Sequence, residues 1–340
     1  MTANTQGIAR YLPLLAAGLL VLIVGISAVV LIQNRTGDAD APLDAQTQEE
    51  LTKAREAVDF YINSDRLPEA RLILERLLQR YPDEAQAHAL MAKLLMAEDA
   101  FAEAYRHADR SVQIDPGDHE VQFLTALLAE QNREFEKARD HYIRATELAP
   151  QVAGYAMYLA QAHIRLDEID EASVHLERAQ RLDATLSQIY SMQAEIAARQ
   201  DDIEAAIALV DQALEQTDRE ERHYVNYTLQ KAELLRRDGN ADGAQAVLLA
   251  LPPGKQQEQR VVQQLSEGYY MLDQPERAAA VWSELFALEP GNARAAAETG
   301  LAFYRAQQYE HAKRYHEYAR RISTNHQTVL ALEEALQDAN

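Results

Sequence analysis

The sequence contains no cysteine among its 340 residues. This absence excludes disulfide bonds, metal sites built from thiolates and cysteine nucleophiles. Glycine and proline are also scarce, with 12 and 10 copies, whereas Ala, Leu, Glu, Gln and Arg are frequent. Because tight hairpins need glycine and proline, and because the frequent residues favour helices, the composition predicts an all-α protein.

Positive charge is scarce as well. The chain carries 33 Lys and Arg against 54 Asp and Glu, a formal net charge of −21. DNA, RNA and anionic lipid headgroups would therefore meet net repulsion, which argues against nucleic acid as a partner. At 47% apolar residues the chain has enough material for a large core, in one large domain or two ordinary ones.

One long stretch lacks charge altogether, at residues 11–32. A helix of this length spans about 33 Å, enough to cross a hydrocarbon core of roughly 30 Å. The stretch predicts a transmembrane helix, preceded by a tail at 1–10 and followed by an acidic flexible linker at 33–46. A cleaved signal peptide is the alternative, although its apolar core is usually shorter.

The charges around this stretch give a weak signal for orientation. Arg10 and the terminal amine precede it, whereas Arg35 follows it together with three aspartates. This bias, with the short tail, predicts that the tail stays in the cytosol and that the body after residue 46 lies outside it.

The body repeats itself at a fixed interval. Alanine recurs every 34 residues, with one insertion of four residues, at Ala70, Ala104, Ala138, Ala172, Ala206, Ala244, Ala278 and Ala312. Mostly small residues lie twelve positions earlier, and larger ones such as Leu74, Tyr142 and Trp282 lie four positions later. This spacing predicts pairs of antiparallel helices that cross at small residues, with larger side chains filling the space beside the crossing.

The pattern resembles the tetratricopeptide repeat, a helix-turn-helix unit of 34 residues. The resemblance implies an α-solenoid, a right-handed superhelix of about eight units, at 51–84, 85–118, 119–152, 153–186, 187–220, 225–258, 259–292 and 293–326. The sixth unit departs most from the pattern, because it holds the insertion near 219–222 and an early Pro252–Pro253 pair. We expect a bend or register change there, and a capping helix within residues 325–340.

Several groups of polar residues invite a catalytic interpretation. Asp140, His141 and Tyr142 are adjacent, so on a helix their side chains do not face one another. His163 and His316 occupy packing positions of the repeat. The sequence has no phosphate-binding or nucleophile motif, and we predict no enzyme activity, no cofactor and no metal site.

In families with this repeat, the first helix of each unit lines a concave surface that receives peptides or helices. Transfer of the family's contact positions gives aromatic and methionine residues whose large side chains suit a peptide surface, namely Phe123, Met157, Tyr158, Met192, Tyr270, Met271 and Tyr304. It also gives an arginine stripe that would dock acidic side chains, namely Arg165, Arg199, Arg236, Arg237 and Arg305. Alternatively, the arginines solvate helix ends, and Phe123 and Met157 pack between units.

The resemblance extends to bacterial single-span proteins that support assembly of envelope complexes. It implies a scaffold anchored in the bacterial inner membrane, with its repeat body in the periplasm and other proteins as partners. Two alternatives remain open: a spacer that self-associates into a homo-oligomer without a peptide ligand, and a docking subunit that regulates an enzyme.

Overall fold

The computed structural model describes residues 45–338. The predicted tail, the predicted transmembrane helix at 11–32 and most of the predicted linker lie outside the described residues. Helix α2 begins at Ala45, so the folded body takes in the end of the segment predicted as linker. None of the described helices is both long enough and apolar enough to cross a membrane.

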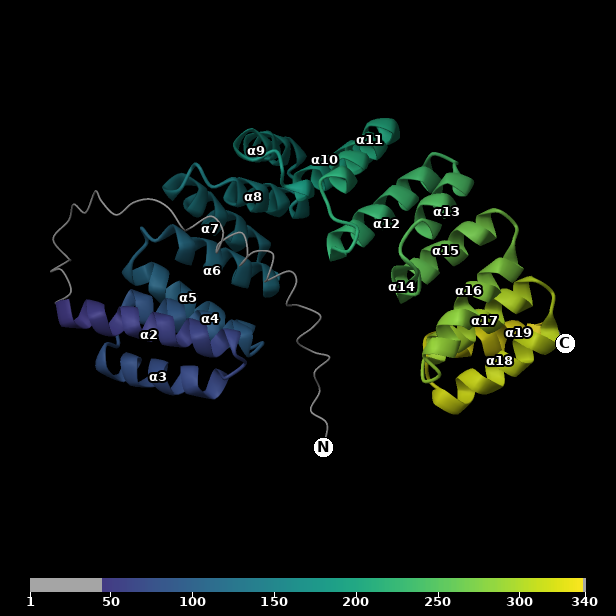
Figure 1. Ribbon diagram of the computed structural model, residues 1–340, viewed down its shortest axis with the longest axis horizontal. Helices are drawn as coiled ribbons and strands as arrows, with labels where there is room; N and C mark the ends of the chain where they lie inside the picture. The colour runs from purple at the N-terminus through teal and green to yellow at the C-terminus, as the bar shows by residue number, and fades with distance from the viewer. Residues whose placement is uncertain (1–44, 339–340) are drawn as a thin grey trace. The chain divides into compact units, whose positions relative to one another are not determined.

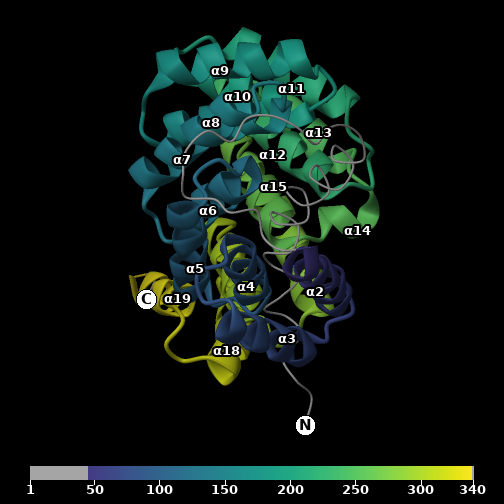
Figure 2. The same cartoon turned by 90° about the vertical axis from the view of Figure 1, so that its left-hand side faces the viewer.

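The described residues form eighteen helices and no strand, which confirms the all-α prediction. Contacts divide the chain into two compact parts at Glu168 and Ile169, inside the predicted fourth unit. The N-terminal part holds α2 (Ala45–Asn63), α3 (Leu67–Arg80), α4 (Ala85–Ala97), α5 (Phe101–Ile114), α6 (His119–Gln131), α7 (Phe135–Leu148) and α8 (Ala153–Arg165). Its helices pack in chain order, as Figures 1 and 2 show for the α2/α3 and α4/α5 hairpins.

The C-terminal part contains the remaining eleven helices. They are α9 (Ile169–Leu182), α10 (Ser187–Arg199), α11 (Ile203–Glu215), α12 (Arg222–Arg237), α13 (Ala241–Leu249), α14 (Pro253–Gln256), α15 (Gln259–Met271), α16 (Pro275–Leu288), α17 (Ala293–Arg305), α18 (Tyr309–Ile322) and α19 (Gln327–Asp338). Helices α10/α11, α12/α13, α15/α16 and α17/α18 form hairpins, and each hairpin also packs against the next.

The alanines of the repeat lie where the predicted helix crossings require them. All eight are almost completely buried, with exposed fractions of 0–1%. The larger residues four positions later include Tyr142 and Trp282, which are also buried. These positions confirm the predicted packing pattern of small and large side chains.

The first helix of every hairpin ends in the same way. The second residue after each helix end has a left-handed backbone, and the next residue's N–H donates to the carbonyl five positions earlier at 2.8–2.9 Å, as Arg66 does to Tyr61. This is a Schellman cap, which satisfies carbonyls that the helix leaves free. The left-handed residues are Asp65, Asp99, Arg133, Asp167, Asp201, Gly239, Asp273 and Gln307.

The irregular sixth unit has a shortened second helix. Helix α13 has only 9 residues and ends at Leu249, before Pro252 and Pro253. Gln256 takes over the capping, because its side-chain amide donates to the carbonyls of Leu249 and Leu251 at 2.9 and 2.6 Å. The departure from the pattern is therefore accommodated by early termination and the short helix α14.

Helix α19 covers the last hairpin, as the capping prediction requires. Its residues Val329, Leu332 and Leu336 are buried against α17 and α18. A Cβ atom at Gly300 would clash with the side chain of Leu332. The glycine of the eighth unit is thus explained by the close approach of the cap.

Gly239 offers a test of the cap geometry. Its φ is +79°, and a Cβ there would meet no heavy atom within 4 Å, so replacement affects the backbone alone. We expect Gly239→Ala to lower the free energy of unfolding by about 1 kcal/mol, because alanine disfavours the left-handed region. Gly254→Ala is the matched control, since Gly254 also has open space but no positive φ. Equal denaturant midpoints for the two variants would contradict the assignment.

Candidate protein-binding surface

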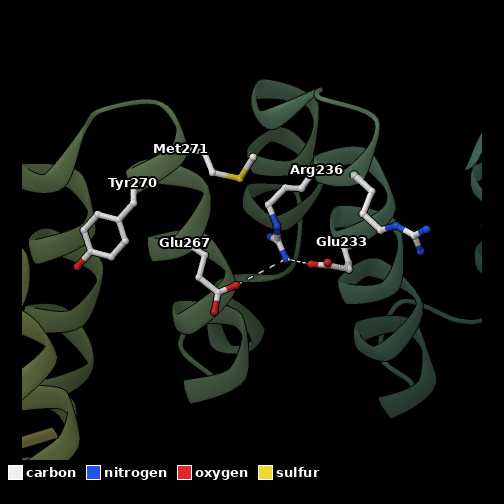
Figure 3. A pocket seen from close by; sticks show the side chains of 6 residues that line it. Glu233, Arg236, Glu267, Tyr270 and Met271 are labelled. Atoms are coloured by element: carbon white, nitrogen blue, oxygen red, sulfur yellow. Dashed lines mark hydrogen bonds and ion pairs between the residues drawn. The ribbon is translucent and has the colours of Figure 1, made fainter.

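A shallow groove of about 450 Å³ lies between α12 and α15 in the C-terminal part (Figure 3). Four residues that the sequence predicted as partner contacts line it: Arg236, Arg237, Tyr270 and Met271. Glu233 and Glu267, which are not among the predicted contacts, complete the lining. Each helix buries its apolar side in the core and turns these residues toward the groove.

Arg236 forms the centre of the groove floor. Its side chain is only 6% exposed and pairs with Glu233 on its own helix. Its guanidinium also lies 3.7 Å from the carboxylate of Glu267 on α15, and it donates to the carbonyl of Gln264 at 3.4 Å. Figure 3 shows Arg236 between the two carboxylates. The arginine therefore links two neighbouring hairpins, and its charge is already matched by two acids.

The apolar residues among those that line the groove are Tyr270 and Met271, whose side chains point to different sides of α15 (Figure 3). Met271 is 57% exposed, a large fraction for an apolar side chain. The guanidinium of Arg305 lies 4.1 Å from the centre of the Tyr270 ring, a cation–π contact that holds the ring in place. Burial raises the pKa of Tyr270 to about 12, so its hydroxyl stays neutral near neutral pH.

The other predicted arginines also have partners within the protein. Arg165 pairs with Glu130 at 3.0 Å and Arg199 with Glu195 at 2.7 Å. Arg237 donates to the carbonyl of Ala198 at 2.9 Å.

The predicted arginine stripe therefore consists of side chains that already have partners within the protein, and its role in binding stays a prediction. Each of these arginines is held by a carboxylate, a carbonyl or a ring of the protein, and several of the contacts join one hairpin to the preceding one. The alternative, in which the arginines serve helix ends and packing, describes them better.

The predicted aromatic and methionine contacts differ in burial. Phe123 and Met157 are buried, which corrects their assignment as partner contacts and favours the alternative of packing between units. Phe123 stacks on Tyr155 at 4.8 Å and meets the edge of Tyr158 at 5.1 Å, so this group is core packing of the N-terminal part. Met192 is partly buried. Tyr304 is partly buried too, and meets Tyr309 edge to face at 5.5 Å.

The adjacent Asp140, His141 and Tyr142 have three separate sets of partners. Tyr142 is fully buried and donates to Glu130 at 2.8 Å. His141 contacts the side-chain oxygen of Gln122 at 2.8 Å, whereas Asp140 is exposed and pairs with Arg139 at 3.1 Å. Burial raises the pKa of Glu130, opposed by the Tyr142 hydroxyl and by Arg165. The trio thus serves helix packing.

A second small depression, in the N-terminal part, is lined by a histidine pair that sequence reasoning missed. His88 and His107 have their Nδ1 atoms 3.0 Å apart, and Nε2 of His88 donates to the carbonyl of Pro82 at 3.0 Å. Because a carbonyl only accepts, this bond leaves Nδ1 of a neutral His88 as the acceptor from His107. Within the described residues, no three acidic or histidine side chains are grouped closely enough to hold a metal.

This pair predicts a pH effect on stability. Burial lowers the pKa of His107 from 6.5, and His88 and Arg106 lower it further. The unfolded chain therefore binds more protons at low pH, and stability that is complete above about pH 6.5 is lost as the pH falls through the lowered pKa. The melting temperature should fall on acidification, and the fall should be smaller for His107→Gln.

The control for this measurement is His311→Gln, which removes an exposed imidazole from α18. His141 and His223 also have pKa values lowered by burial, so part of the acid sensitivity should persist in His107→Gln. An unchanged slope of melting temperature against pH in His107→Gln would contradict the role of the pair.

Two family models match parts of the chain. The tetratricopeptide repeat model matches residues 53–94, and a model described as anaphase-promoting complex, cyclosome, subunit 3 matches residues 97–179. No curated protein matches the chain.

Solved structures with the same type of fold extend the comparison. PilF of Pseudomonas aeruginosa is 16% identical, with a TM-score of 0.55 over 65% of this chain and 99% of PilF. PilW, described as a widely conserved type IV pilus biogenesis factor, is 12% identical, with a TM-score of 0.54 over 64% and 97%. The Cut9–Hcn1 structure of the APC/C is 17% identical, with a TM-score of 0.52 over 82% and 48%. At such low identities the likeness establishes the fold: the described residues form a helical solenoid of the tetratricopeptide type.

Proposed function

We propose that this chain is a membrane-anchored scaffold that binds a peptide segment or helix of a partner protein and supports the assembly of an envelope complex. The observation that carries the proposal is the groove between α12 and α15, where the Met271 side chain lies exposed. An exposed, flexible thioether offers adaptable apolar contact area, which suits a partner side chain.

The rigidity of the groove supports this role. The core sides of α12 and α15 are anchored by buried residues such as Val225, Val261 and Leu265. Arg236 joins the two helices across the floor, and Arg305 fixes the Tyr270 ring. A partner segment would therefore meet a surface that is already formed, so that little ordering energy is spent on binding.

The location of the scaffold is part of the proposal. We place the chain in a bacterial inner membrane through residues 11–32, with the repeat body in the periplasm. The support is the uncharged stretch itself and its flanking charges. PilW shares the fold and is named as a pilus biogenesis factor, and an assembly role of that kind would suit an anchored scaffold.

The groove is tested with the full chain in mild detergent and a phage-displayed library of random peptides. We expect selected peptides to lose at least about tenfold in affinity, or 1.4 kcal/mol, for Met271→Asp, because a carboxylate replaces the apolar contact. Leu288→Asp is the matched control, since Leu288 is also 57% exposed but lies outside the groove. Peptides that bind wild type and Met271→Asp equally well would refute the groove as the site.

The anchor is tested by fractionation of cells that express the full chain or a variant without residues 11–32. The full chain should stay with the membranes after alkaline extraction, whereas the variant should be released. Because the chain has no cysteine, Glu310→Cys, at a side chain that is 88% exposed, gives a single labelling site. A membrane-impermeant maleimide should label it from the periplasmic side; labelling only after lysis would contradict the proposed orientation.

A further inference from the structure

The groove carries a pattern of carboxylates that bears on its ligand. Glu195, Glu233 and Glu267 occupy the same position in three consecutive hairpins, eleven residues before Ala206, Ala244 and Ala278. All three belong to the C-terminal part. Two of them, Glu233 and Glu267, line the groove between α12 and α15.

The floor of the groove has more exposed negative charge than positive charge. The side chains of Glu233 and Glu267 are 54% and 47% exposed, whereas that of Arg236 is 6% exposed. A single buried guanidinium is thus shared by two carboxylates that face solvent. The remaining cation of the lining, Arg237, is 42% exposed, and its guanidinium donates to the carbonyl of Ala198 on α10 and lies 3.8 Å from Asp201.

A further acidic residue lies near Glu267, on the α17 side of α15. Glu298 of α17 is largely buried, and burial raises its pKa. The negative charge of Glu267 raises this pKa as well, whereas Arg294 and Arg305 oppose the effect. At longer range the net charge of −21 attracts cationic segments and repels anionic ones.

We infer that the groove binds a segment in which a Lys or Arg side chain neighbours an apolar side chain. The cationic group contacts the exposed sides of Glu233 and Glu267, on the solvent side of Arg236, and the apolar side chain packs on Met271. This assignment rests on the proposed function, and it reverses the charge of the ligand that the arginine stripe had suggested. An acidic side chain at the same place would face two carboxylates and find the nearest guanidinium already bound.

The experiment compares three sets of synthetic peptides that share their apolar residues but carry Lys and Arg, Ser, or Asp and Glu at the variable positions. Binding to the full chain in mild detergent is measured by fluorescence anisotropy. We expect the basic set to bind most tightly. Glu233→Gln combined with Glu267→Gln should weaken the basic set by about three- to tenfold, since partly exposed ion pairs are modest contributors.

Two further variants make the comparison specific. Glu204→Gln combined with Glu215→Gln, both exposed on α11, changes the net charge equally but leaves the groove untouched, and should not alter affinity. Glu267→Gln alone keeps the closer Arg236–Glu233 pair, so it should fold normally and still weaken the basic set.

The outcomes separate the two proposals. Tightest binding of the acidic set, still dependent on Met271, would overturn the charge assignment and leave the groove as the binding site. Equal weakening by the groove and α11 variants would show attraction by net charge alone, and would also overturn it. Absence of Met271-dependent binding in all three sets would overturn the proposed function itself.

Discussion

The approach of two helices at a buried alanine, repeated once in every hairpin, is the constraint on which the rest of the structure depends. The alanine side chain is a single methyl group, so the helix backbones come close, and larger residues one turn away fill the remaining space. Within each compact part the hairpins pack on one another, so each crossing also affects the spacing of neighbouring first helices. The groove lies where α12 and α15, two such first helices, are neighbours.

Two further devices keep the hairpins in register. The Schellman caps end every first helix at the same repeat position, and the residue in the left-handed conformation turns the chain into the second helix. Three of the arginines near these helix ends reach toward the preceding hairpin: Arg165 to Glu130, Arg237 to the carbonyl of Ala198 and Arg305 to the ring of Tyr270. The caps are local in sequence and fix the turn within a hairpin. The arginine contacts span about one repeat and fix the stacking of one hairpin on the next.

The sequence was sufficient to predict the helix pairs. Small residues recur where two backbones approach closely, and this close approach depends little on side-chain conformation. The caps were also visible in principle, since Asp recurs at positions 65, 99, 167, 201 and 273. The contacts of the arginines were harder to predict, because a long side chain that begins on the predicted surface can fold back onto the protein. Arg236, for example, is buried although its position suggested a ligand contact. Phe123 and Met157 were misassigned for a related reason: neighbouring hairpins cover a face that one helix alone would expose.

The buried arginine under the groove differs in kind from the alanine crossings. Burial of a charge costs desolvation energy, and an apolar side chain of similar size would often stabilise a protein as well or better. An apolar residue at position 236 would also leave Glu233 and Glu267 without their shared cation, and two like charges would then face each other across the groove. With Arg236 in place, both carboxylates stay near the surface and the gap between α12 and α15 remains polar at its floor. Arg236 therefore affects the polarity of the groove more than the free energy of unfolding. Its charge allows two acidic side chains to line the space between α12 and α15, where an apolar residue would favour apolar packing.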